Sequence, residues 1–144
     1  MSRWLGLNAR TLKRLLTGTA VAIAVFQGPA LLAQKVSLAM LDRLEAGEWD
    51  VRDRDPAGMH DRICISSGRK LVQIRHMTEV CRSFVVEDAA DVVTVHYTCP
   101  GNGYGQTRIR FENTRLVQLE TQGIAKGLPF EINAEARRTG ACTR

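Results

Sequence analysis

Strict alternation of apolar and polar residues is the feature that most constrains the fold of this chain. The pattern is cleanest between residues 128 and 137. Its apolar positions are Leu128, Phe130, Ile132, Ala134 and Ala136, and its polar positions are Glu131, Asn133, Glu135 and Arg137. Successive side chains of a β-strand point to opposite faces, so a period of two predicts a strand with one buried and one solvated face.

The same period recurs through most of the chain after residue 46. The strongest of these segments carries Val93, Val95, Tyr97 and Cys99 on one face. Further strands are expected at residues 48–52, 63–65, 81–87, 104–111 and 116–120, with turns at residues 54–58, 88–91, 100–103, 113 and 123–127. Short strands joined by short turns predict a mainly β fold, either a single antiparallel curved sheet or a small barrel-like meander, with one or two short helices.

Two segments are candidates for those helices. Residues 35–46 place Met40, Leu41 and Leu44 on one side, with Ser37 as a possible cap and a glycine at the end. Residues 66–76 are ambiguous. Ser66 or Ser67 could cap a short helix, but residues 70–75 could equally form a strand; we favour the helix.

The N-terminal segment has the three parts of a secretory signal peptide. Residues 1–14 carry four basic residues and no acidic one, and the following stretch from Leu15 to Phe26 is uncharged and apolar. Gly28 and Pro29 then break the pattern, and the small residues Ala30 and Ala33 offer cleavage positions. This arrangement predicts a signal peptide at residues 1–33 and a mature domain at residues 34–144.

An uncleaved membrane anchor is the alternative interpretation of this segment. The stretch from Leu15 to Ala33 has no charged residue, and a spanning helix needs about 20 residues. The Gly28-Pro29 pair and the short apolar core favour cleavage. Both interpretations place the domain outside the cytoplasm, in the periplasm or secreted, and membrane contact is expected only through an uncleaved leader.

The charge balance of the mature domain argues against a nucleic-acid partner. The chain carries 20 basic and 15 acidic residues, a net charge of +5. Four of the basic residues precede the apolar stretch, so 16 basic and 15 acidic residues remain in the domain. A nearly neutral domain has no strong electrostatic attraction to polyanions.

All four cysteines lie in the predicted mature domain. Cys64, Cys81, Cys99 and Cys142 form an even set in a short exported chain, which predicts two disulfides. Four cysteines allow three pairings, and we favour Cys64 with Cys81 and Cys99 with Cys142. Their spacing matches no zinc motif, so neither a metal site nor a cofactor is expected.

The three histidines give no catalytic constellation at the level of sequence. His96 lies on the polar face of its strand between two threonines, and His60 precedes Asp61 near a turn. A general base needs a partner within hydrogen-bonding distance, and sequence spacing does not supply one. We therefore assign no catalytic residue and expect solvated histidines.

Three other motifs also have ordinary structural interpretations. Residues 101–105 are glycine-rich, but a strand follows them where a phosphate-binding loop needs a helix, so a hairpin turn is expected. Arg108, Arg110 and Arg115 could form a basic stripe, but Arg108 and Arg110 alternate onto the solvated face of a strand, where charged side chains keep a sheet surface soluble. The pair Ser66-Ser67 lacks the context of a nucleophile elbow, and Trp49 is expected in the core.

The two ends of the predicted domain resemble a known family. The segment Leu44-Glu45-Ala46-Gly47-Glu48-Trp49-Asp50-Val51 and the ending Ala136-Arg137-Arg138-Thr139-Gly140-Ala141-Cys142 resemble the opening and closing motifs of the exported bacterial proteins known as domain of unknown function 3617. The resemblance covers about residues 44–142. It implies a Gram-negative periplasmic setting, but no activity, cofactor or catalytic residue. Glu48 departs from the family, which usually has a hydrophobic or small residue there.

These observations lead to two functional hypotheses. The first is a non-catalytic envelope domain that binds a small apolar ligand or another envelope protein, because a curved sheet with one apolar face can hold a ligand in its mouth. The second is a periplasmic hydrolase that uses His96 or His60 with a nearby carboxylate. A purely structural envelope role is a further alternative.

The signal-peptide hypothesis predicts a defined mature mass. We expect cleavage near Ala33, so that intact-mass measurement of the protein from its natural host finds a species beginning at or near residue 34. A mature species that retains Met1 to Leu15 would contradict cleavage and support the anchor.

Overall fold

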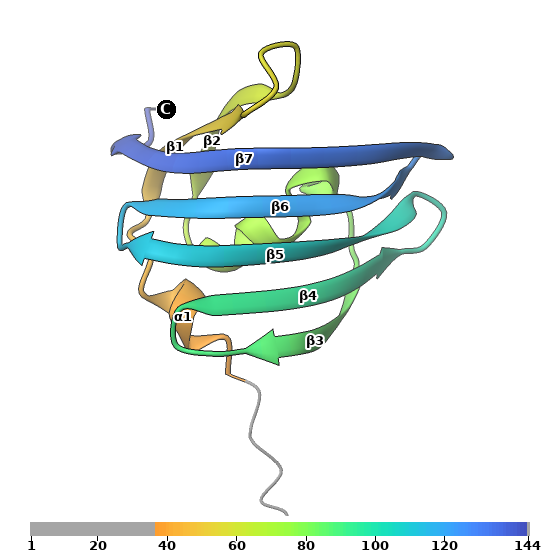
Figure 1. Ribbon diagram of the computed structural model, residues 1–144, viewed down its shortest axis with the longest axis horizontal. Helices are drawn as coiled ribbons and strands as arrows, with labels where there is room; N and C mark the ends of the chain where they lie inside the picture. The colour runs from red at the N-terminus through yellow and green to blue at the C-terminus, as the bar shows by residue number, and fades with distance from the viewer. Residues whose placement is uncertain (1–36, 144) are drawn as a thin grey trace, which may run out of the picture. The chain divides into compact units, whose positions relative to one another are not determined.

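The computed structural model describes residues 37–143, and the predicted signal peptide lies outside the described residues. The described part is mainly β, as the alternation predicts: one open antiparallel sheet of seven strands in the order β2-β1-β7-β6-β5-β4-β3 (Figure 1). The strands are β1 (Gly47–Asp53), β2 (His60–Ile65), β3 (Arg82–Asp88), β4 (Val92–Cys99), β5 (Gly103–Asn113), β6 (Leu116–Ala125) and β7 (Leu128–Gly140). Two short helices accompany them, α1 (Ala39–Asp42) and the 3₁₀ helix η1 (Gly68–His76).

Strands β3 to β7 form a meander, and β7 then pairs with β1. The first and last strands of the domain are therefore neighbours: Val51 lies opposite Ala136. Of the predicted turns, the loop at residues 123–127 is wrong. β6 continues to Ala125, and Lys126 and Gly127 alone make the turn, with φ values of 51° and 81°. Two positive φ values suit the twist of a tight hairpin.

The helical predictions are right in place and partly wrong in length. The helix expected at residues 35–46 is only Ala39–Asp42, because Leu38 adopts a left-handed conformation with a φ of 52°. The ambiguous segment is helical, as favoured. Ser67 caps η1 by accepting a hydrogen bond from the backbone nitrogen of Arg69 at 3.3 Å, and the strand alternative is wrong.

The buried apolar side chains of the central strands point to one face of the sheet, which we call the inner face. Its largest fully buried side chains include Trp49, Tyr97, Ile109 and Leu119. The connection between β2 and β3, residues 66–80, lies against this face behind β5 and β6 (Figure 1). We call this connection the plug. Its buried residues Leu71, Val72 and Ile74 join the same core as the sheet.

The plug also packs on α1. A Cβ on Gly68 would lie 2.5 Å from the carbonyl oxygen of Leu41, so only glycine fits at this contact. Arg69 binds Asp42 through two hydrogen bonds of 2.7 Å. The hydrogen bond from Arg69 lowers the pKa of Asp42, which keeps the carboxylate ionised in the folded state. Plug and α1 thus cover the inner face together.

The favoured disulfide pairing is wrong. The bonds are Cys64–Cys142 and Cys81–Cys99. Cys64 lies on β2 and Cys81 directly precedes β3, and these two strands are opposite edges of the sheet, so the two cysteines do not meet. Cys81 instead faces Cys99 across the β3–β4 hairpin, in which Arg82 pairs with Thr98. Glu48 of β1 pairs with Cys64 of β2 on one side and with Gly140 of β7 on the other. The chain just beyond β7 therefore reaches Cys64.

The two disulfides lie at the two ends of the plug. Cys64 lies two residues before the plug and Cys81 directly after it, and each bonds to a cysteine elsewhere in the fold. Disulfides of this kind indicate an oxidising compartment, extracellular or periplasmic. Across residues 37–143, no helix has the length and apolarity needed to cross a membrane.

The two observed disulfides are expected to contribute unequally to the free energy of unfolding. The sequence separations are 78 residues for Cys64–Cys142 and 18 for Cys81–Cys99, so loop entropy predicts losses of about 4.5 and about 3 kcal/mol when each pair is replaced by alanine. Urea unfolding of the two double variants measures this difference. A non-reducing peptide map containing a Cys64–Cys81 peptide would overturn the pairing.

Candidate functional site

The face of the sheet opposite the plug, which we call the outer face, divides into two halves. One half carries ion pairs and their hydrogen bonds. Arg108 donates to Glu87 at 2.8 Å, and Arg137 donates to Glu135 at 2.9 Å. The hydrogen bond from Arg137 holds the pKa of Glu135 below its ordinary value, against a smaller opposing effect of burial. The charges of this half are therefore largely satisfied within the protein.

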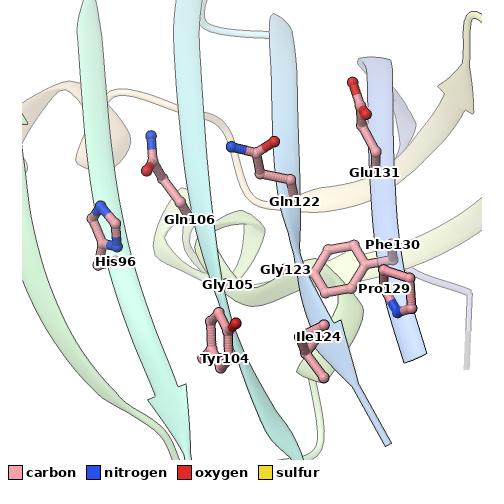
Figure 2. A pocket seen from close by; sticks show the side chains of 10 residues that line it. All are labelled: His96, Tyr104, Gly105, Gln106, Gln122, Gly123, Ile124, Pro129, Phe130 and Glu131. Carbon is pink, nitrogen blue, oxygen red and sulfur yellow. The ribbon is translucent and has the colours of Figure 1, made fainter. Parts of the chain in front are cut away.

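The other half carries a row of polar side chains on four adjacent strands. His96 of β4 pairs with Gln106 of β5, Gln106 with Gln122 of β6, and Gln122 with Glu131 of β7. We call these four residues the polar row, and Figure 2 shows them side by side. Within residues 37–143, the side chains of the polar row make a single hydrogen bond to the protein: Glu131 accepts from Asn133 at 3.4 Å. Most of the row's donors and acceptors are therefore free for a ligand.

An apolar row lies beside the polar one. Tyr104, Ile124 and Pro129 occupy the next outward positions along β5, β6 and β7, where Tyr104 pairs with Ile124 and Ile124 with Pro129. Together the two rows border an open pocket of about 550 Å³ (Figure 2). The pocket is lined by His96, Tyr104, Gly105, Gln106, Gln122, Gly123, Ile124, Pro129, Phe130 and Glu131. The site thus offers polar groups along one side and apolar ones along the other.

The core supports the floor of this pocket. Gly105 and Gly123 lie opposite each other between the two rows, with their missing side chains on the inner face. A Cβ on Gly105 would lie 2.5 Å from the hydroxyl oxygen of Tyr97, so the glycine makes room for this buried ring. The strands that carry the pocket therefore lie directly over the buried ring of Tyr97.

His96, one of the two histidines named for a hydrolase, lies in this pocket without a carboxylate beside it. Glu131 is the acidic residue of the pocket, and three strand spacings separate it from His96. At about 4.8 Å per spacing, their backbones are about 14 Å apart. A direct proton relay between the two side chains does not fit this distance.

His60 does meet a carboxylate. Its Nε2 lies 2.7 Å from Oδ1 of Asp50, on a part of β2 where the His60 side chain is 55% exposed. Burial is the largest single influence on the pKa of Asp50 and raises it, but the hydrogen bond from His60 and the nearby positive charges together lower the pKa. The pair lies on exposed strands outside the pocket.

The remaining motifs have the structural roles expected of them. Residues 100–102 form the β4–β5 turn, and Trp49 is fully buried, with its Nε1 donating to the carbonyl of Glu45 at 3.0 Å. Arg110 pairs with Glu112, and Arg115 lies 3.9 Å from Glu45. Within the described residues, no group of three or more metal-ligating side chains comes together.

His76 is a residue whose role sequence reasoning missed. It is 5% exposed and lines a second pocket, of about 360 Å³, between the end of η1 and the β6–β7 turn. Its Nε2 lies 3.3 Å from the carbonyl oxygen of Asn102, which only accepts hydrogen bonds, so Nε2 carries the proton. Nδ1 lies 3.2 Å from the hydroxyl oxygen of Tyr97. Burial raises the pKa of Tyr97, which keeps this hydroxyl a donor.

No protein-family model, curated protein or solved structure matches this chain. The geometry of the site is therefore the ground for a functional proposal.

The hydrogen bond between Tyr97 and His76 predicts a selective loss of stability. Tyr97→Phe leaves the buried Nδ1 of His76 without its hydrogen-bond partner, so we expect unfolding to become easier by about 1–3 kcal/mol in urea. Tyr104→Phe is the matched control, because Tyr104 is 55% exposed, and its effect should stay within about 0.5 kcal/mol. Equal effects of the two variants would contradict the role given to this bond.

Proposed function

We propose that the mature protein is an exported, non-catalytic binding domain of the bacterial cell envelope, and that it binds its ligand in the outer-face pocket. One observation carries this proposal. His96, Gln106 and Gln122 present free hydrogen-bonding groups beside the exposed ring of Tyr104, in the half of the face that ion pairs leave unoccupied. Pockets with a few convergent polar groups and an apolar wall are the usual form of a small-molecule site.

The outer face is the better location for a ligand because the inner face is filled. A curved sheet could hold an apolar molecule in its mouth, but Leu71, Val72 and Ile74 of the plug already occupy that place. Displacing them would expose the core of the domain. The ligand is therefore assigned to the surface that the fold leaves free.

An exported, periplasmic setting is supported by three independent features. The disulfides need an oxidising compartment, the leader has the pattern of a signal peptide, and the end motifs resemble an exported bacterial family. Membership in that family is part of the proposal. Membership in that family would imply a periplasmic location, but it would not imply a catalytic activity.

A hydrolase centred on His60 is the second candidate, favoured by the 2.7 Å contact with Asp50. A carboxylate that orients a histidine is one element of a hydrolytic site. The binding proposal ranks higher because His60 is exposed on β2 and does not border the outer-face pocket.

Native mass spectrometry of the protein purified from its own envelope tests the binding proposal. We expect a reproducible ligand adduct that disappears on denaturation, and we expect Tyr104→Ala to remove most of it. His60→Ala is the control and should retain the adduct. A bare wild-type protein, or an adduct indifferent to Tyr104→Ala, would refute the site. Hydrolysis of the bound molecule that is abolished by His60→Ala would favour the second candidate.

A further inference from the structure

We infer that the ligand of the outer-face pocket is a neutral oligosaccharide, such as a short stretch of an envelope glycan; this inference rests on the proposed function. Sugars present two kinds of surface, apolar C–H faces on the ring and hydroxyl or acetamido groups around its edge. The outer face offers the matching pair, exposed aromatic rings beside a row of amide and imidazole groups. The OB-fold, another small β fold, also binds oligosaccharides on a face formed by its strands.

Two exposed aromatic rings border the polar row. Tyr104 is 55% exposed and Phe84 is 72% exposed. Phe84 lies on β3 directly opposite His96, so it extends the polar row by one strand on the same face. Exposed aromatic side chains at the edge of a polar pocket are ligand platforms of the right kind, because the negative face of a ring attracts the C–H groups of a sugar.

The spacing of the two rings suits an extended saccharide. Phe84 and Tyr104 are two strands apart and one same-face step apart along the strands. Strand spacings of about 4.8 Å and a rise of about 3.4 Å per residue place their backbones about 12 Å apart. This span accommodates more than one sugar ring, so an oligosaccharide fits better than a single sugar.

The polar row supplies hydrogen bonds of both kinds. Each glutamine amide has two donors on nitrogen and an acceptor on oxygen, and Gln106 and Gln122 are direct neighbours. Neighbouring amides can bond at the same time to a hydroxyl and to the C=O or N–H of an acetamido group. His96 and Glu131 at the two ends of the row extend this capacity.

The side chains that line the pocket disfavour anionic ligands and acyl chains. Neither lysine nor arginine is among the residues that line it in the described part of the chain, so phosphates, sulfates and nucleic acids lack a counter-charge. An acyl chain would strip water from Gln106 and Gln122 without replacing their hydrogen bonds, which is costly. A neutral polyhydroxylated molecule avoids both penalties.

Calorimetric titration of the exported, disulfide-bonded protein tests the inference. The probes are a linear trisaccharide of N-acetylglucosamine, maltotriose and a sulfated trisaccharide. We expect at least one neutral trisaccharide to bind and the sulfated one to bind more weakly. Nuclear magnetic resonance should show shifts of the side-chain amide signals of Gln106 and Gln122.

Paired variants locate the binding surface. Tyr104→Ala and Gln122→Ala should each weaken binding by roughly tenfold. Gln118→Ala is the control for Gln122, because both glutamines lie on the outer face of β6, but Gln118 is bonded to Arg54 at 2.9 Å in the charged half. Leu128→Ala is the control for Tyr104, since Leu128 is 70% exposed and outside the pocket lining. Both controls should bind like the wild type.

The outcomes separate this inference from the proposed function. Binding of a neutral trisaccharide that depends on Tyr104 and Gln122 supports both. Trisaccharide binding that neither variant affects overturns the site. If no trisaccharide binds while the envelope adduct still depends on Tyr104, the sugar assignment is wrong and the binding domain stands. If neither dependence is found, both are wrong.

Discussion

A single sheet with one apolar face cannot bury that face by itself, and the plug meets this requirement here. Leu71 and Ile74 of η1 fill the inner face, and α1 covers the rest through Met40 and Leu41. A 3₁₀ helix is short and has strained hydrogen-bond geometry, so it has little stability of its own. The fold instead holds it at both ends. On one side Cys64 belongs to β2 and bonds to Cys142 beyond β7, and on the other side Cys81 bonds to Cys99 of β4.

This arrangement explains why the two faces of the sheet differ in what they leave exposed. With the inner face filled, ligands have access to the outer face, whose charged half is internally paired. Strands β4 and β5 contribute neighbouring residues to the core and to the outer-face pocket. Tyr97 packs against Gly105 from within and bonds to His76 at the end of η1. His96 and Gln106, which follow or precede these residues in sequence, project into the outer-face pocket. The core therefore fixes the spacing of the groups that the ligand would meet.

The sequence predicts the strands well, because alternation reports directly on burial: Val93, Val95, Ile132 and Ala134 are all buried as expected. It predicts less where geometry is needed. The Cys81–Cys99 bond can be predicted from the sequence, because a hairpin that turns at residues 88–91 places residue 81 near residue 99. Cys64–Cys142 depends on β1 lying between β2 and β7, which no local pattern reveals. Likewise, the sequence marks His96 as a candidate site residue, but its neighbours in the polar row follow from strand register. Nothing in the sequence marks His76 as buried.

The central claim is that the Cys81–Cys99 disulfide holds the plug on the sheet, and native-state hydrogen exchange tests it most directly. The comparison is between the wild type and the double variant Cys81→Ala with Cys99→Ala. If the bond fastens the plug, amides of residues 68–76 should lose protection at least tenfold more than the central amides of β5 and β6, because the plug can then open without global unfolding. If plug and central strands lose protection equally, the bond acts only by constraining the unfolded chain, and the account is contradicted.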